Sequence, residues 1–91
     1  MPLFTLICTD KPDSESLRMA NRSAHLAYIE DTGVVVQAGP FLGAKGGMTG
    51  SLVIVDLPDR AAAEGWAAGD PYARAGLFGD VRIEAWKKVI G

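Results

Sequence analysis

The segment from Ser14 to Thr32 contains neither proline nor glycine, and it constrains the fold of this chain more than any other feature. Asp13 and Ser14 are residues that favour a helix N-cap, and Gly33 can adopt the left-handed backbone that ends a helix. We therefore expect one long helix over this segment. The chain has 91 residues, which is the size of one compact domain, so a single domain over 1–91 is expected.

The apolar residues of this helix fall on two stripes rather than one. Each stripe recurs at helical spacing, which indicates that two faces of the helix are covered. The first stripe consists of Leu17, Ala20, Ala24 and Tyr28, and the second of Met19, Leu26 and Ile29.

Four short runs rich in apolar and β-branched residues predict strands. The first ends at the turn-forming Asp10-Lys11-Pro12-Asp13, and the second ends at Gly39-Pro40, which should disturb a β ladder. A glycine-rich loop over 43–50 joins the second and third runs, so a hairpin-like connection is expected. The predicted strands are 2–9, 34–38, 51–56 and 81–90.

An alanine-rich segment after Asp59 predicts a second helix, because Ala63 and Trp66 recur at helical spacing and Gly69 closes the segment. The residues that follow, 71–79, read as a structured turn before the last strand.

The resulting order is β-α-β-β-α-β, which is the ferredoxin-like plan of the α+β class. In this plan a four-stranded antiparallel sheet carries both helices on one face. The third predicted strand has apolar residues on both of its faces, so the sheet face that no helix covers requires a partner. Because a chain this short has no further element to cover it, we expect a homodimer.

Charge and hydropathy exclude several classes of protein. Nine basic and eleven acidic residues give a net charge of -2, with no basic run beyond Lys87-Lys88, so no nucleic-acid partner is expected. No apolar stretch approaches the ~20 residues that span a membrane, and the N-terminus lacks a secretory pattern. The one cysteine, Cys8, cannot form an internal disulfide, which favours a cytoplasmic location.

A metal or cofactor site is not expected. One histidine excludes a multi-histidine site within a subunit, and no cysteine cluster replaces it. The glycines over 43–50 match neither GxxxxGK[ST] nor GxGxxG, so a loop over a cleft and a plain hairpin loop stay open as alternatives. Cys8 is typical of a packing residue, and Trp66, Trp86 and Phe78 are expected in the core.

His25 lies in the middle of the long helix, with Arg18 and Arg22 on the same side. A neutral imidazole can exchange a proton near neutral pH, and guanidinium groups beside it favour an anionic ligand. From sequence alone the other interpretation is the stronger one, because a lone helical histidine is usually a partly exposed surface or packing residue. Asp70 lies in ordinary turn chemistry, but it would fix the tautomer of His25 if the fold brought the two together. Ser51 lacks the GxSxG context of a serine hydrolase.

Several short motifs coincide, in order and spacing, with those of the YciI-like (YCII-related) family, which the chain resembles over nearly its whole length. The motifs are Asp10-Lys11, Arg22-Ser23-Ala24-His25-Leu26, Ala38-Gly39-Pro40, Thr49-Gly50-Ser51, Trp66-Ala67, Asp70-Pro71-Tyr72, Ala75-Gly76-Leu77-Phe78 and Trp86-Lys87-Lys88-Val89.

The resemblance implies a ferredoxin-like domain of the dimeric α/β-barrel type with an active-site histidine and aspartate. These correspond to His25 and Asp70 in this sequence. The resemblance also matches Arg22 to the family's arginine and Ser51 to its glycine-loop serine, and with Tyr72 they are the candidates for substrate binding. A dehydrochlorinase of chlorinated hydroxyquinols is related to the family, so the resemblance extends to elimination chemistry.

These residues lead to one hypothesis and one alternative. In the hypothesis the chain is a small cytoplasmic enzyme, and His25, oriented by Asp70, exchanges a proton with a small anionic or enolisable molecule in an elimination or isomerisation. In the alternative the chain is a non-catalytic module that binds a metabolite or a partner in the same cleft. A solvent-reachable pair in a pocket favours the enzyme, and a buried, fully hydrogen-bonded pair favours the binding module.

Overall fold

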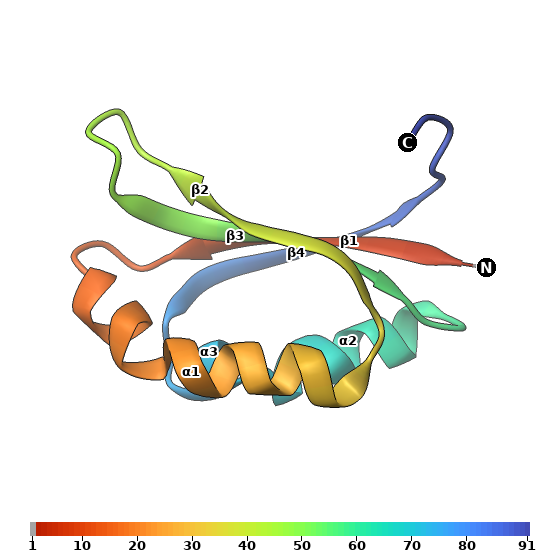
Figure 1. Ribbon diagram of the computed structural model, residues 1–91, viewed down its shortest axis with the longest axis horizontal. Coiled ribbons are helices and arrows are strands. Elements are labelled where there is room, and N and C mark those ends of the chain that lie inside the picture. Colours follow the sequence, from red (N-terminus) through yellow and green to blue (C-terminus); the bar gives the residue numbers. More distant parts are fainter. Residues whose placement is uncertain (1) are drawn as a thin grey trace.

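The computed structural model describes residues 2–91, which form a four-stranded sheet covered by helices (Figure 1). Along the chain the elements are β1 (Leu3–Asp10), α1 (Glu15–Thr32), β2 (Val35–Leu42), β3 (Met48–Asp56), α2 (Arg60–Gly69), α3 (Pro71–Arg74) and β4 (Phe78–Trp86).

The strands form one antiparallel sheet in the order β2-β3-β1-β4. All the helices lie on the same side of this sheet, as Figure 1 shows. The predicted ferredoxin-like α+β fold is confirmed, with α3 as an additional short helix in the segment expected to be a turn. In the centre of the sheet Cys8 pairs with Ser51, and Thr9 pairs with Gly50. This register fixes where β3 presents its polar residues to the helices.

The helix ends follow from their flanking residues. Gly33 has a φ of 64° and donates its N–H to the carbonyl of Ile29 at 3.3 Å, which ends α1 in the expected left-handed conformation. Ser14 occupies the N-cap position of α1 without making a side-chain capping hydrogen bond. Asp59 caps α2 by accepting the backbone N–H of Ala62 at 2.8 Å.

The prediction that Gly39-Pro40 would disturb the second strand is wrong, because β2 continues to Leu42. β2 is an edge strand that pairs with β3 alone, and a proline is tolerated there when its missing N–H would face away from the neighbouring strand. The hairpin also starts β3 earlier than expected, since Met48 pairs with Leu42.

The last strand spans Phe78–Trp86 rather than the predicted 81–90. Leu3, at the start of β1, pairs with Trp86, so β4 has no neighbouring strand beyond this point. Alternating sequence continues past Trp86, but a strand ends where its partner ends.

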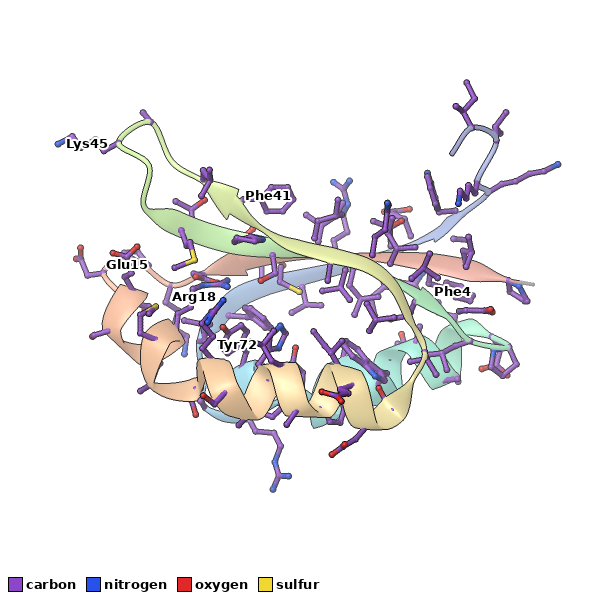
Figure 2. The ribbon with its side chains drawn as sticks, in the orientation of Figure 1. Phe4, Glu15, Arg18, Phe41, Lys45 and Tyr72 are labelled. Atoms are coloured by element: carbon purple, nitrogen blue, oxygen red, sulfur yellow. The ribbon has the colours of Figure 1, made fainter. Side chains whose placement is uncertain are left out.

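The core lies between the sheet and the helices. Phe4, Leu6 and Cys8 alternate along β1 and are buried on the helix side. Figure 2 shows Phe4 in this layer. The buried Trp66 of α2 joins this cluster, and its indole N–H donates to the hydroxyl of Thr32 at 3.0 Å, which ties α2 to the end of α1.

The face that α1 turns toward the sheet is more polar than predicted. The buried residues of α1 are Arg18 and His25. Met19 and Leu26, which belong to the second predicted stripe, are 54% and 46% exposed, so the expectation that two apolar faces are covered is wrong for the single chain. A buried arginine and a buried histidine on one helix require polar partners.

The sheet face opposite the helices carries apolar side chains. Phe41 points away from the helices on β2 (Figure 2), and Ile7 and Leu52 are paired on the same face and half-buried. Trp86 was expected in the core, and that prediction is wrong because the side chain is 41% exposed. Within residues 2–91 none of the helices is long and apolar enough to cross a membrane.

Candidate active site

His25 and Asp70 meet between α1 and the α2–α3 connection. Nδ1 of His25 lies 2.7 Å from Oδ1 of Asp70, and the two residues are 7% and 2% exposed. A carboxylate only accepts hydrogen bonds, so this contact assigns a proton to Nδ1, and in a neutral imidazole the lone pair is then on Nε2. The structure thus places together the two residues that the sequence placed far apart.

Asp70 is positioned by the backbone at the junction of two helices. Its N–H donates to the carbonyl of Ala67 at 3.3 Å, and its Oδ1 accepts the N–H of Tyr72 at 3.0 Å. Pro71 takes the first position of α3, where its missing N–H and restricted φ favour the start of a helix. The turn chemistry of this segment therefore aims the carboxylate at α1.

Tyr72 packs against the imidazole of His25. Its ring stacks on that of His25 with centroids 3.9 Å apart and planes 12° apart. The ring of Phe78 packs edge-on against the Tyr72 ring, with the two centroids 6.1 Å apart. Burial raises the pKa of Tyr72 despite the opposing charge of Arg18, so the phenol stays protonated around neutral pH.

A cavity of about 260 Å³ opens beside the imidazole, between α1 and the sheet. Four of the predicted site residues line this cavity: Arg22, His25, Ser51 and Tyr72. Asp70 lies behind His25, to which it is hydrogen-bonded, and does not line the cavity. Among residues 2–91, Nε2 of His25 has no hydrogen-bond partner. The free nitrogen of the pair therefore faces a space that suits a molecule smaller than most drug-sized ligands.

Arg18 and Asp10 belong to the same cluster, although sequence reasoning did not include them among the site residues. Arg18 is 3% exposed, and its Nε and Nη2 donate to the two carboxylate oxygens of Asp10 at 2.8 and 2.9 Å. Its Nη2 also donates to Oγ of Ser51 at 2.9 Å. Burial opposes the charge of Arg18, but the hydrogen bond and charge of Asp10 outweigh it and raise the pKa of the guanidinium. The signals in the sequence were the acidic end of the first strand and an arginine at helical spacing from His25.

Arg22 differs from Arg18 in its surroundings. It is exposed at the cavity wall and makes no ion pair within the described part of the chain, whereas the charge of Arg18 is compensated by Asp10. Arg22 is therefore the cation of the cavity wall that has no carboxylate partner within the described residues.

The structure also bears on two other kinds of site, a cysteine nucleophile and a metal centre. Burial, followed by the charges of Asp70 and Asp10, raises the pKa of Cys8 from 9.0 to about 12, so the thiol is protonated at neutral pH and packs in the core. Across residues 2–91 there is no cluster of three or more His, Cys, Asp or Glu side chains of the kind that holds a metal ion.

The glycine-rich segment is a hairpin connection. The N–H of Gly43 donates to the carbonyl of Gly47 at 2.7 Å, and Gly46 has a φ of 85°, which favours glycine. Gly50 lies inside β3, where a Cβ would collide with the carbonyl oxygen of Cys8. Figure 2 shows Lys45 at the tip of the hairpin, pointing away from the protein.

Comparisons with known proteins agree with this architecture. Residues 2–87 match the YCII-related domain. Protein YciI from Escherichia coli O6:H1 (strain CFT073) is 36% identical over 96% of this chain and 98% of its own length. An uncharacterized protein of Haemophilus influenzae is 34% identical over 94% of this chain and 97% of its own length.

Solved structures with the same fold include an enzyme. The 5-chloro-2-hydroxyhydroquinone dehydrochlorinase of Burkholderia phenoliruptrix AC1100, in complex with 2,5-dihydroxybenzoquinone, superposes with a TM-score of 0.86 at 35% identity, covering 93% of each chain. An antibiotic biosynthesis monooxygenase, 16% identical with a TM-score of 0.62 over 99% of this chain and 100% of its own, shares the fold. The family match and the identity to YciI over almost the entire length show that this chain belongs to the YCII-related family.

Proposed function

We propose that the chain is a small enzyme that uses the His25–Asp70 pair for cofactor-independent acid/base chemistry on a small anionic molecule. The observation that carries the proposal is the pair itself: Nδ1 is held by Asp70 at 2.7 Å while Nε2 faces a cavity. A pair that served only the core would be expected to have both nitrogens engaged by protein groups.

The reaction class that suits this arrangement is elimination or isomerisation. Nε2 of His25 accepts a proton from the substrate, and Asp70 stabilises the imidazolium that forms. In an elimination the leaving group departs with the electrons of its bond, so one proton and one anion are lost and no oxidant is consumed. In an isomerisation the same imidazolium returns the proton to another atom of the substrate.

The charge of the cavity favours an anion as substrate. Arg22 is exposed at the cavity wall and forms no ion pair with a described residue, whereas Arg18 is paired with Asp10. The fold relative that is 35% identical is a dehydrochlorinase bound to 2,5-dihydroxybenzoquinone. We therefore infer that hydroxylated, enolisable ring compounds are the substrate class to test first.

The test uses the purified chain with 5-chloro-2-hydroxyhydroquinone under exclusion of air, with chloride release as the readout. Chloride release is expected from the parent, and His25→Gln should be slower by a factor on the order of 10² or more. Met19→Gln, an exposed position of the same helix, is the matched control and should retain the parental rate.

The binding of 2,5-dihydroxybenzoquinone, measured by calorimetry, separates the enzyme from the binding module. Binding by both the parent and His25→Gln, with no chloride release by either, would assign the cavity to a non-catalytic module for such molecules. A parent that neither binds the quinone nor releases chloride would overturn the substrate class.

The open sheet face supports a second copy of this chain as partner. Phe41 is 39% exposed and Trp86 is 41% exposed on this face, and a hollow of about 430 Å³ lies over Phe41 and Leu52. Apolar surface of this kind is stabilised when it is covered. A homodimer with the two sheets facing one another would cover it.

A further inference from the structure

One side chain of the cluster, Arg18, contacts three elements at once. It reaches Asp10 at the end of β1 and Ser51 on β3 by hydrogen bonds, and its guanidinium carbon lies 4.8 Å from the centroid of the Tyr72 ring of α3. Figure 2 shows Arg18 and Tyr72 adjacent to one another between α1 and the sheet. A charged side chain that is 3% exposed is costly to bury, so its hydrogen bonds must be complete for the fold to tolerate it.

The Tyr72 ring contacts two side chains of the same helix, α1. The guanidinium of Arg18 packs against its ring, and the imidazole of His25 stacks on it at 3.9 Å. Planar guanidinium groups stack well on aromatic rings. The Tyr72 ring therefore connects the guanidinium of Arg18 with the imidazole of His25, whose Nδ1 is also held by Asp70.

The contact with Ser51 has a directional consequence. A serine hydroxyl has one proton and two lone pairs, and Nη2 of Arg18 uses one lone pair of Ser51 at 2.9 Å. Within residues 2–91 the Ser51 hydroxyl proton has no acceptor, and the residue lines the cavity. The donor that remains is available to an oxygen atom of a ligand.

We propose that Arg18 is a positioning residue: anchored by Asp10, it holds the Tyr72 ring against His25 and orients the Ser51 hydroxyl as a hydrogen-bond donor toward a substrate oxygen. The statement about the substrate oxygen rests on the proposed function. The statement about Tyr72 and His25 concerns the free protein and does not depend on it.

The first experiment uses the fact that His25 is the one histidine of the chain. Its imidazole proton resonances in an NMR spectrum are therefore assigned without ambiguity, and the stacked Tyr72 ring shields them. Tyr72→Leu removes the ring and defines the unshielded position. Arg18→Lys keeps the charge opposite Asp10 but lacks the planar guanidinium, so it should move the resonances most of the way to that position.

Arg60→Lys is the matched control for this substitution. Arg60 is exposed at the start of α2 and pairs with Glu64 at 3.5 Å, so the His25 resonances should stay where they are in the parent. A folded Arg18→Lys protein with parental His25 resonances would overturn the proposal. If Arg18→Lys does not fold, Asp10→Asn replaces it, with the same expected displacement and the same contradicting result. Failure of both to fold would assign the ion pair to core stability and would also overturn the proposal.

The second experiment measures kinetics with 5-chloro-2-hydroxyhydroquinone. Arg18→Lys should lower kcat with little change in KM, because the imidazole is misaligned while Arg22 still attracts the anion. A higher KM with parental kcat would show that Arg18 acts as a direct binding charge instead. Ser51→Ala should weaken the binding of 2,5-dihydroxybenzoquinone about 10-fold, as expected for one lost hydrogen bond, without moving the His25 resonances. Parental affinity in Ser51→Ala would overturn the donor role of Ser51.

These readouts are separable from the test of the enzyme itself. The NMR comparison needs no ligand, so an absence of chloride release in the parent leaves the test of Arg18 intact. Conversely, parental His25 resonances in Arg18→Lys, together with an active parent, would remove Arg18 from the mechanism and leave the His25–Asp70 proposal standing.

Discussion

A single oxygen atom of Asp70, Oδ1, accepts both the Nδ1 proton of His25 at 2.7 Å and the backbone N–H of Tyr72 at 3.0 Å. The same atom therefore caps a helix and orients the imidazole. The carboxylate of Asp70 thus has a structural role in capping α3 and a proposed role in catalysis, and substitutions can distinguish the two roles.

Asp70→Asn keeps the size and the capping ability of the side chain but removes its charge. We expect chloride release from 5-chloro-2-hydroxyhydroquinone to fall on the order of 10²-fold, while the free energy of unfolding changes by only about 1–2 kcal/mol. Rates and thermal unfolding are measured on the same preparation. A loss of several kcal/mol with parental turnover would show that the pair is structural.

Arg22→Gln tests the charge of the cavity. The affinity for 2,5-dihydroxybenzoquinone should fall roughly 10-fold, since one charge-assisted hydrogen bond at a partly solvated site is lost. Because screening weakens such an interaction, the difference between parent and variant should shrink as salt is raised. Calorimetric titrations at low and high salt check both statements. Arg60→Gln, at an exposed position of α2, should bind like the parent, and equal affinities of Arg22→Gln and parent would contradict a role for Arg22.

Gly50→Ala tests the close approach of the strands beside Ser51. An added Cβ would collide with the carbonyl oxygen of Cys8, so β1 and β3 must separate and the protein should lose about 1–3 kcal/mol in urea unfolding. Gly39→Ala is the control, because a Cβ there meets nothing within 4 Å. Similar stabilities of the two variants would show that the sheet accommodates the extra atom.

Cys8 predicts a loss of stability at alkaline pH. Burial raises its pKa from 9.0 to about 12, so the thiol ionises in the unfolded chain before it ionises in the folded one. The stabilising contribution is complete below pH 9 and is lost as the pH rises toward 12, with a slope on the order of 1 kcal/mol per pH unit.

The comparison is made with Cys8→Ala by urea unfolding across this pH range. Burial also raises the pKa of Tyr28 and Tyr72, but these residues are present in both proteins and their effect cancels in the difference. Parallel curves for the two proteins would show that the folded and unfolded thiols ionise alike.

The open sheet face predicts a dimer. Light scattering at micromolar concentration should give twice the mass of 9.6 kDa, and Leu52→Arg should convert the protein to a monomer by placing a charge in the apolar face. Met19→Arg adds the same charge on the exposed side of α1 and should stay dimeric. A monomeric parent would contradict the prediction.

The sequence by itself determined the elements and much of their chemistry. The segment without proline or glycine that precedes Gly33 forms α1, and α2 begins after Asp59 and ends at Gly69. These ends could be predicted because a helix end depends on residues that are neighbours along the chain. The apolar run at the N-terminus predicted β1, in which Phe4, Leu6 and Cys8 lie on one face. The sequence also named His25 and Asp70 as the candidate catalytic pair, through the chemistry of their side chains and the family resemblance.

Only the tertiary structure decided how distant residues meet. Strand ends followed from pairing, as where Leu3 limits β4 at Trp86, and no local pattern records the length of a partner. The polar face of α1 was misjudged for the same reason: Arg18 can be buried only because Asp10 and Ser51 arrive from two strands to satisfy it. The 2.7 Å contact of His25 with Asp70 likewise exists because α3 docks against α1, which is a property of packing between elements and not of either segment alone.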